Sequence, residues 1–241
     1  MLYKTRGIVL HYIKYSETSL IVTIYTENFG RQAYIINGVR SKKSKIKANM
    51  FQPLFLLDME VYYKPKRDLQ RAKEIQSAFV FTTLPYDLKK STLAIFIAEI
   101  LYKTIREQEP NKELFNYLFN SIQLLDLKEK GISNFHLYFL IHLTKYLGFF
   151  PSNNYSEINC YFDLKAGSFV QIKPMHLSIL EKDQSIFFNK MLNFSEDQHE
   201  ELKLKYKDRI ILLEKLIEYY ILHNDGISNI KSLDIFKEVF H

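Results

Sequence analysis

The pattern of hydrophobic residues changes once along this chain, near Pro85, and that change limits the folds available to it. Before this proline, short segments rich in β-branched and aromatic residues are separated by turn-forming residues, as is typical of strands. Beyond it, apolar residues recur at the three- and four-residue spacings of helices. The sequence therefore predicts an α+β protein, with a β domain at residues 1–80 and a helical domain at residues 81–241.

Five strands are expected in the β domain, with a long connection between the third and the fourth. The glycine at the end of the turn Glu27–Gly30 would supply a positive φ. Five short strands with this spacing suit a small closed barrel of the OB (oligonucleotide/oligosaccharide-binding) type. The expected strands cover residues 6–13, 20–26, 32–36, 54–63 and 69–79.

The helical domain should contain five helices. The first is apolar on nearly all sides, so it should lie in the middle of its domain. Gly148 stands where a C-cap glycine is expected. Residues 151–173 form an irregular insertion, with a turn at residues 163–167 between two short extended pieces. The expected helices cover residues 87–107, 113–127, 134–147, 207–224 and 232–240.

Positive charge is concentrated in the first third of the chain. The net charge of the 241 residues is +6. Residues 1–80 hold 14 lysines and arginines against 6 acidic residues, a net charge of +8. Residues 81–241 hold 19 against 21, a net charge of −2. This asymmetry indicates two regions with different partners.

No acidic residue occurs between Glu27 and Asp58, and five cations fall within residues 40–47. Such a run is typical of a phosphate-binding surface, although a solvated loop that only keeps the protein soluble would look the same. A second cluster lies near the turn between the fourth and fifth strands, close to where OB barrels hold oligonucleotides. This second cluster comprises Lys64, Lys66, Arg67, Arg71 and Lys73.

Tyrosine and phenylalanine rings accompany the cations and could stack on nucleic-acid bases. Most of them are expected to fill the barrel core instead. No side-chain pattern for a particular base is present, so binding should tolerate any sequence and depend on salt. The rings in question are Tyr12, Tyr15, Tyr25, Phe29, Tyr34, Tyr62 and Tyr63.

The sequence gives little support for catalysis. The glycines are too far apart for a G-x-G-x-x-G or Walker A loop, and no G-x-S-x-G elbow occurs. His136 and His142 are six residues apart on one expected helix, so they should be hydrogen-bonded or exposed histidines and not a zinc pair. Asp58 and Glu60 could hold Mg²⁺ in a nuclease, but a solvated strand face explains them as well. We therefore predict no catalytic residue, no metal and no cofactor.

The single cysteine, Cys160, excludes a disulfide within the chain and a multi-thiolate metal site. It is best read as a small buried hydrophobe. The first residues do not resemble a signal peptide, and no uncharged apolar stretch reaches the roughly 18 residues of a membrane span. We expect a cytoplasmic protein, associated with the nucleoid and with no membrane partner.

Several stretches together resemble the RecO family of bacterial recombination mediators. They occur in the order and at the spacing of that family and span nearly the whole chain. In the β domain they are Thr5–Leu10, Tyr15–Ser19, Tyr25–Gly30, Gly38–Arg40 with Ser44, and Gln52–Leu54. In the helical domain they are Leu147–Pro151, Phe162–Gly167, Tyr220–His223 and Lys231–Leu233.

The resemblance implies a protein that binds single- and double-stranded DNA and anneals complementary strands. It also implies action with RecR in loading the recombinase RecA onto DNA coated by single-strand-binding protein (SSB), whose acidic C-terminal tail the family grips. Lys145 and Arg209 are candidate cations for that tail. The predicted DNA-binding residues are Arg6, Arg31, Arg40, Lys42, Lys43, Lys45, Lys47, Lys66, Arg67 and Arg71.

One departure from the family concerns zinc. Many members carry a four-cysteine zinc module after the Leu-Gly…Pro element, whereas residues 153–173 here contain only Cys160. We expect the zinc module to be lost and this segment to be held by packing, with Tyr155, Tyr161, Phe162 and Phe169 as candidates.

Two other functions remain open from the sequence. One is an RNA-binding OB protein of translation or ribosome assembly, which a preference for the 2′-hydroxyl would reveal. The other is a metal-dependent nuclease that uses Asp58 and Glu60.

Overall fold

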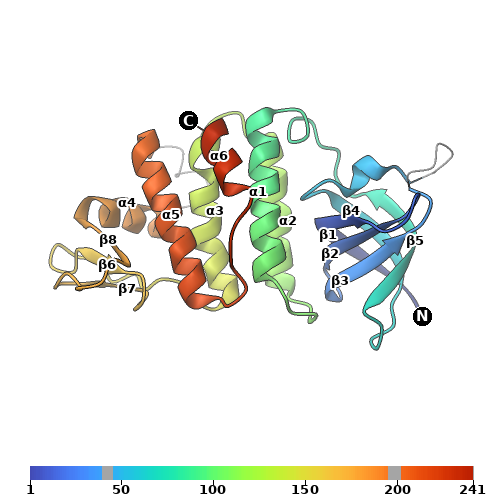
Figure 1. The fold of residues 1–241 in the computed structure, drawn as a ribbon, viewed down its shortest axis with the longest axis horizontal. Coiled ribbons are helices and arrows are strands. Elements are labelled where there is room, and N and C mark those ends of the chain that lie inside the picture. Colours follow the sequence, from blue (N-terminus) through green and yellow to red (C-terminus); the bar gives the residue numbers. More distant parts are fainter. Residues whose placement is uncertain (40–45, 195–201, 241) are drawn as a thin grey trace. The chain divides into compact units, whose positions relative to one another are not determined.

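The computed structural model describes residues 1–39, 46–194 and 202–240, and it divides into two compact units (Figure 1). Unit 1 covers Met1–Leu127 and unit 2 covers Lys128–His241. Unit 1 thus contains two helices besides the expected β domain. The division into domains at residues 80 and 81 stays a prediction.

The N-terminal β domain is a closed five-stranded barrel, as predicted. Its strand order is β1-β2-β3-β5-β4, and β1 closes the barrel by pairing with β4. The β3–β5 pair is parallel and all other pairs are antiparallel, which is the arrangement of an OB barrel. The strands are β1 (Leu2–Lys14), β2 (Leu20–Thr26), β3 (Gly30–Ile36), β4 (Leu56–Tyr62) and β5 (Leu69–Ser77).

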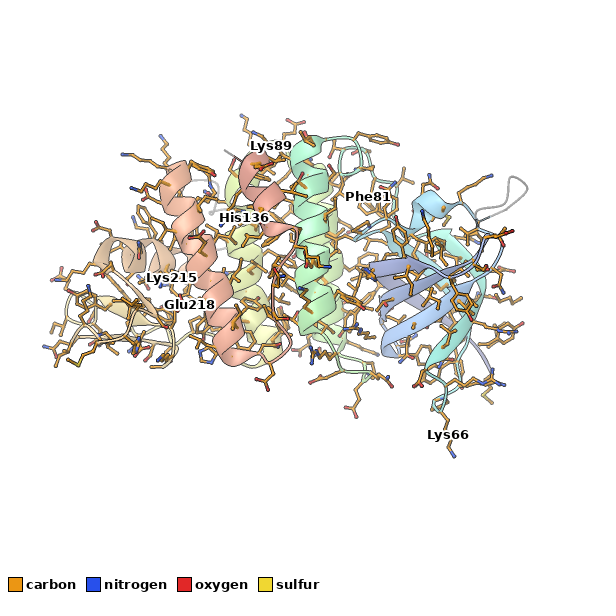
Figure 2. The ribbon with its side chains drawn as sticks, viewed as in Figure 1. Lys66, Phe81, Lys89, His136, Lys215 and Glu218 are labelled. Carbon is orange, nitrogen blue, oxygen red and sulfur yellow. The ribbon has the colours of Figure 1, made fainter. Side chains whose placement is uncertain are left out.

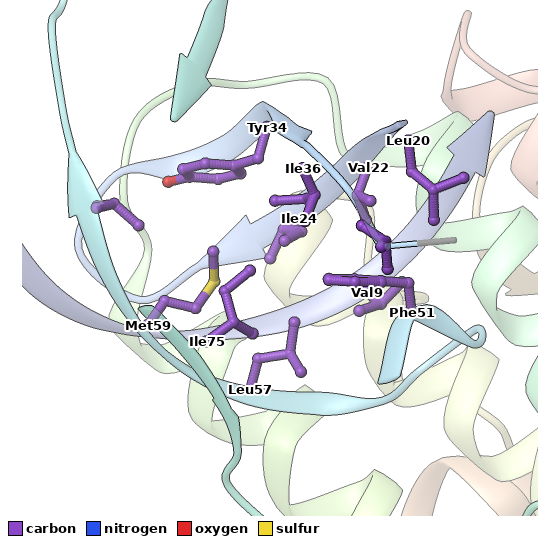
Figure 3. Packing of buried hydrophobic residues seen from close by; sticks show 12 residues of the cluster. Val9, Leu20, Val22, Ile24, Tyr34, Ile36, Phe51, Leu57, Met59 and Ile75 are labelled. Atoms are coloured by element: carbon purple, nitrogen blue, oxygen red, sulfur yellow. The ribbon is translucent and has the colours of Figure 1, made fainter. Parts of the chain in front are cut away.

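Alternating residues of the strands point into the barrel and form its core (Figure 3). This alternation follows from the period of two in a strand, which sends successive side chains to opposite faces. Phe51 adds an aromatic ring from a short 3₁₀ helix, η1 (Ala48–Phe51), which the sequence did not predict. The labelled core side chains are Val9, Leu20, Val22, Ile24, Tyr34, Ile36, Phe51, Leu57, Met59 and Ile75.

Two positive-φ positions explain where strands begin. Gly30 has a φ of 60°, as expected for the turn before β3, and an added Cβ would lie 2.4 Å from the carbonyl oxygen of Glu109. Leu54 has a φ of 65° and is buried. Because that conformation interrupts an extended strand, β4 begins at Leu56, two residues later than expected.

Two helices complete unit 1, namely α1 (Leu88–Thr104) and α2 (Lys112–Leu127). The side chain of Asp87 caps α1 by accepting a hydrogen bond from the backbone N–H of Lys90. Helix α1 is buried on most of its sides, as its apolar sequence predicted, and it packs on β1.

Unit 2 is mainly helical. Its helices are α3 (Ile132–Leu147), α4 (Lys182–Asn193), α5 (Tyr206–His223) and α6 (Leu233–Val239). Gly148 ends α3 with a φ of 86°, as predicted. Helix α4 was missed, although its capping box between Glu181 and Gln184 is a signal that the sequence carries. No helix among the described residues is both long and apolar enough to cross a membrane.

The insertion at residues 151–173 is held by packing, as expected. It contains β6 (Tyr161–Asp163) and β7 (Ser168–Val170), which form a three-stranded sheet with β8 (Ile179–Leu180). The rings of Phe162 and Phe169 are 4.9 Å apart, and both are buried. The side chain of Asn154 donates to the carbonyl oxygen of Phe169 and accepts from its N–H group, so it covers the outer edge of β7.

Candidate nucleic-acid interface

The cations of the barrel differ in their partners, and two groups of them bear on nucleic-acid binding. In the first group, acidic side chains neutralise the cations. Lys4 and Lys73 lie 3.8 and 3.1 Å from the carboxylate of Glu60, and Arg6 lies 2.9 Å from that of Glu27. Lys73, which the sequence grouped with the basic turn, is therefore neutralised locally.

The second group lies on and beside the β4–β5 turn. Lys64, Lys66, Arg67 and Arg71 have no side-chain hydrogen bond or ion pair with any described residue. Lys66 stands at the tip of the turn and points away from the barrel (Figure 2). Residues 64–71 hold these four cations and one acidic residue, Asp68, so the segment carries a net charge of +3, which favours external anions. We call these four residues the turn cations.

Gln70 fixes the shape of the turn that carries these cations. Its side chain is buried, accepts from the N–H of Lys64 at 3.0 Å, and donates to the carbonyl oxygens of Lys64 and Arg67 at 2.8 and 2.6 Å. These bonds satisfy backbone groups that strand pairing leaves open. The turn is thereby held in one conformation before any ligand arrives.

A hollow of about 280 Å³ opens beside the turn. Tyr62, which is 47% exposed, is one of its lining residues. Tyr62 and Arg71 are directly opposite each other on β4 and β5, so their side chains share one face of the sheet. The full lining is Tyr62, Lys64, Arg67, Leu69, Gln70 and Arg71.

The other candidate stacking rings are buried, stacked on each other or exposed. Tyr25 and Tyr34 are buried, in agreement with the expected core role. Phe29 and Tyr63 stack on each other with centroids 4.1 Å apart, so they occupy each other's faces. Besides Tyr62, only Tyr12 and Tyr15 of the seven rings are well exposed.

Two of the predicted DNA-binding arginines have structural partners inside unit 1. The guanidinium of Arg6 binds Glu27 and lies 4.7 Å from the ring centroid of Phe119. Its hydrogen bond to Glu27 raises the pKa of Arg6 and lowers that of the carboxyl group. Arg31 donates to the carbonyl oxygens of Tyr102 and Ile105 at the end of α1.

These contacts tie the barrel to α1 and α2, which the sequence did not reveal. Burial lowers the pKa of Arg31. A DNA role for Arg6 and Arg31 stays a prediction. Arg40, Lys42, Lys43 and Lys45 lie outside the described residues, while Lys47 is exposed at the start of η1.

The nuclease alternative finds no support in the geometry around Asp58 and Glu60. The carboxylate of Glu60 is engaged by Lys4 and Lys73. Within residues 1–39, 46–194 and 202–240, no three His, Cys, Asp or Glu side chains gather in a way that could hold a metal ion.

Cys160 is buried, as expected for a small hydrophobe.

The prediction for His136 was wrong. This side chain is fully buried on α3, yet neither of its ring nitrogens has a hydrogen-bond partner in the described part of the chain. Its ring instead packs 4.6 Å from that of Phe236. The partly buried His142 places Nε2 3.3 Å from the carbonyl oxygen of Met191, as a hydrogen-bonded histidine would.

The candidate cations for the SSB tail also differ in their surroundings. Arg209 donates to the side-chain oxygen of Asn134 and to the carbonyl oxygen of Leu204, while Lys145 is exposed. Arg209 therefore has a structural role in unit 2, and a contact of Lys145 or Arg209 with the tail stays a prediction.

Comparison with known proteins connects this structure to one family. Residues 1–81 match the family model "Recombination protein O N terminal", and residues 85–233 match "Recombination protein O C terminal". The chain is 39% identical over 240 residues to the DNA repair protein RecO of Phocaeicola vulgatus, covering 100% of both chains. It is 40% identical over 239 residues to that of Flavobacterium psychrophilum, covering 98% of both. The chain therefore belongs to the RecO family of DNA repair and recombination proteins.

Proposed function

We propose that this protein binds single- and double-stranded DNA, anneals complementary strands, and acts with RecR to load the recombinase onto DNA coated by SSB. As a RecO family protein it is a non-enzymatic recombination mediator. It would act in the cytoplasm at the nucleoid and grip the C-terminal tail of SSB. The observation that carries the DNA-binding part is the contrast between the turn cations, which lack acidic partners, and Lys4, Arg6 and Lys73, which acidic side chains neutralise.

The physical basis of annealing would be electrostatic. Two DNA strands repel through their phosphates, and this repulsion slows their encounter. A cationic surface that binds both backbones offsets it while releasing counterions. Because such contacts read phosphates and not base edges, the bases stay free to pair.

Family membership weighs against the RNA-binding alternative. The matched relatives are DNA repair proteins, which disfavours a role in translation or ribosome assembly. Competition between DNA and RNA strands of matched sequence would test whether the protein prefers deoxyribose or ribose.

The decisive test is annealing of complementary strands that are both coated by SSB. The protein should accelerate annealing of these strands, because it would recruit the coated complex and reduce backbone repulsion. An SSB lacking its C-terminal tail is the matched control, and acceleration should be weaker with it. Unchanged annealing rates with intact SSB would contradict the mediator role.

The salt dependence of binding tests the turn cations. Replacing Arg67 and Arg71 by alanine should weaken binding to single strands of every sequence and flatten the log–log salt slope by about 1.4 units, because each lost phosphate contact contributes about 0.7. The control variant, Lys4→Ala with Lys73→Ala, removes the same formal charge from residues that already pair with Glu60. Its slope should stay close to that of the parent protein.

The basic run at residues 40–47 is tested in the same assay. Replacing Arg40, Lys42, Lys43 and Lys45 by alanine should flatten the slope by roughly three units if each residue contacts one phosphate. An unchanged slope would mean that the run only keeps the protein soluble.

A further inference from the structure

We infer that the hollow beside the β4–β5 turn takes one unpaired nucleotide, with its base against Tyr62 and its flanking phosphates on the turn cations. The inference rests on the proposed DNA binding and goes beyond it, because a subsite for a base gives the protein a preference for single strands. A surface of phosphate contacts alone gives no such preference.

The lining of the hollow offers a surface to each half of a nucleotide. Its volume is about 280 Å³, and Tyr62 and Leu69 contribute apolar surface to its lining. Lys64, Arg67 and Arg71 bring three cations to the same opening. Bases stack on aromatic faces, and phosphates bind guanidinium groups, so both chemistries meet within one site.

The orientation of Tyr62 follows from strand alternation. Val61, its neighbour on β4, is wholly buried in the barrel core, so Tyr62 must point outward. The face of an outward tyrosine ring can be covered by another ring or by a cation. No ring contact or cation–π contact involves Tyr62 within the described residues, which leaves its face open.

The other exposed tyrosines lack this setting. Tyr12 and Tyr15 are 43% and 60% exposed, yet neither lines the hollow. Exposure alone therefore does not distinguish Tyr62. What distinguishes it is the combination of an open ring face, a defined hollow and cations without acidic partners.

The backbone of the β4–β5 turn is held in place before a nucleotide binds, which favours binding. The three hydrogen bonds of Gln70 hold the backbone that carries Lys64 and Arg67, so binding does not have to order the turn. Gln70 is thus a positioning residue, since its own amide is already used within the protein.

Such a site selects single strands for a simple reason. In a duplex, each base is stacked between its neighbours and paired, and extruding it costs a few kcal/mol. In a single strand the same base is free to leave its neighbours and stack on Tyr62. Duplex DNA would then bind through phosphate contacts only.

The chain contains no tryptophan, which allows a direct fluorescence test. A Tyr62→Trp variant carries one reporter in the hollow. Its emission should be quenched by a short single-stranded oligothymidine, and far less by an abasic strand of equal length or by a duplex. A Tyr15→Trp variant reports on an exposed ring outside the hollow, and oligothymidine should leave its emission almost unchanged.

Affinity measurements provide the second readout. Tyr62→Ala should weaken binding of oligothymidine by about 5- to 150-fold, as expected for one lost stacking contact. Binding of the abasic strand should be unaffected, and Tyr62→Phe should retain the parent affinity for both.

The outcomes separate this inference from the proposed function. Tight, salt-dependent DNA binding with no quenching at Tyr62→Trp, or an equal loss for oligothymidine and the abasic strand in Tyr62→Ala, would overturn the nucleotide site alone. Absence of DNA binding by the parent protein would overturn both. Selective quenching by oligothymidine, together with a selective loss in Tyr62→Ala, would establish the site.

Discussion

Replacing Asp126 by asparagine should lower the free energy of unfolding of unit 1 by about 3–5 kcal/mol. The carboxylate of Asp126 is fully buried at the end of α2. It accepts hydrogen bonds from three consecutive backbone N–H groups, those of Thr82, Thr83 and Leu84, at distances of 2.6–2.9 Å. An amide would place donors against donors, and each buried N–H left unpaired costs about 1–3 kcal/mol.

The Asp126 network also holds the segment that joins the barrel to α1. The Lys90 ammonium donates to the main-chain oxygen of Asp126 and to the hydroxyl of Thr83. Burial alone would raise the pKa of Asp126, but hydrogen bonds from the N–H groups of Leu84, Thr82 and Thr83 outweigh it and lower the pKa. The stabilisation is therefore present above the ordinary pKa of an aspartate and is lost as the pH falls through the lowered value.

Urea unfolding followed by circular dichroism would measure this effect at neutral pH. Asp225→Asn is the matched control, because Asp225 is exposed and its replacement should change stability by no more than about 0.5 kcal/mol. Equal midpoints for Asp126→Asn and the control would contradict the role assigned to the network.

Acid should destabilise unit 2 through His136, and His136→Leu should remove that sensitivity. Burial, with a smaller contribution from the nearby Arg209 cation, lowers the pKa of His136 to about 3. Its ordinary value is 6.5. Between these values only the unfolded chain binds the proton, so the stability of the protein falls by roughly 1.4 kcal/mol per pH unit as the pH drops from 6.5 toward 3.

The comparison of pH profiles isolates His136 from the acidic residues that titrate in the same range. The free energy of unfolding of His136→Leu should fall less steeply than that of the parent below pH 6.5. Above this pH the variant should be about as stable, because leucine fills the site without two unpartnered ring nitrogens. Parallel profiles for the two proteins would contradict this prediction, because they would show that the folded protein protonates His136 as readily as the unfolded chain does.

Local patterns in the sequence were enough to predict the barrel. Strand β2 was predicted at residues 20–26, where the structure has it, because β-branched residues fill it between clear turn signals. The start of β4 was predicted less well, since the positive φ of Leu54 is imposed by its buried surroundings and not by its residue type. Helix α4 was missed because its polar first turn masks a short apolar face.

The candidate site could be predicted only in part, for a physical reason. A charge cluster is visible in sequence, but the partner of each cation depends on the fold. Lys73 and Arg71 are two positions apart, yet Lys73 faces Glu60 and Arg71 lines the hollow with Tyr62. Likewise, the tethering of Arg31 to the end of α1 joins residues about seventy positions apart, which no local pattern reveals.

The side chain of Asn154 protects one edge of the small sheet, and this bears on how the protein can be purified. By filling both backbone positions of Phe169, it denies the short β7 edge to any other chain, so this edge of the sheet does not offer a template for aggregation. The aromatic packing beside it needs neither a metal nor a disulfide. Strong chelators and reducing agents should therefore leave this part of the protein folded, which permits purification under conditions that would unfold a zinc-dependent domain.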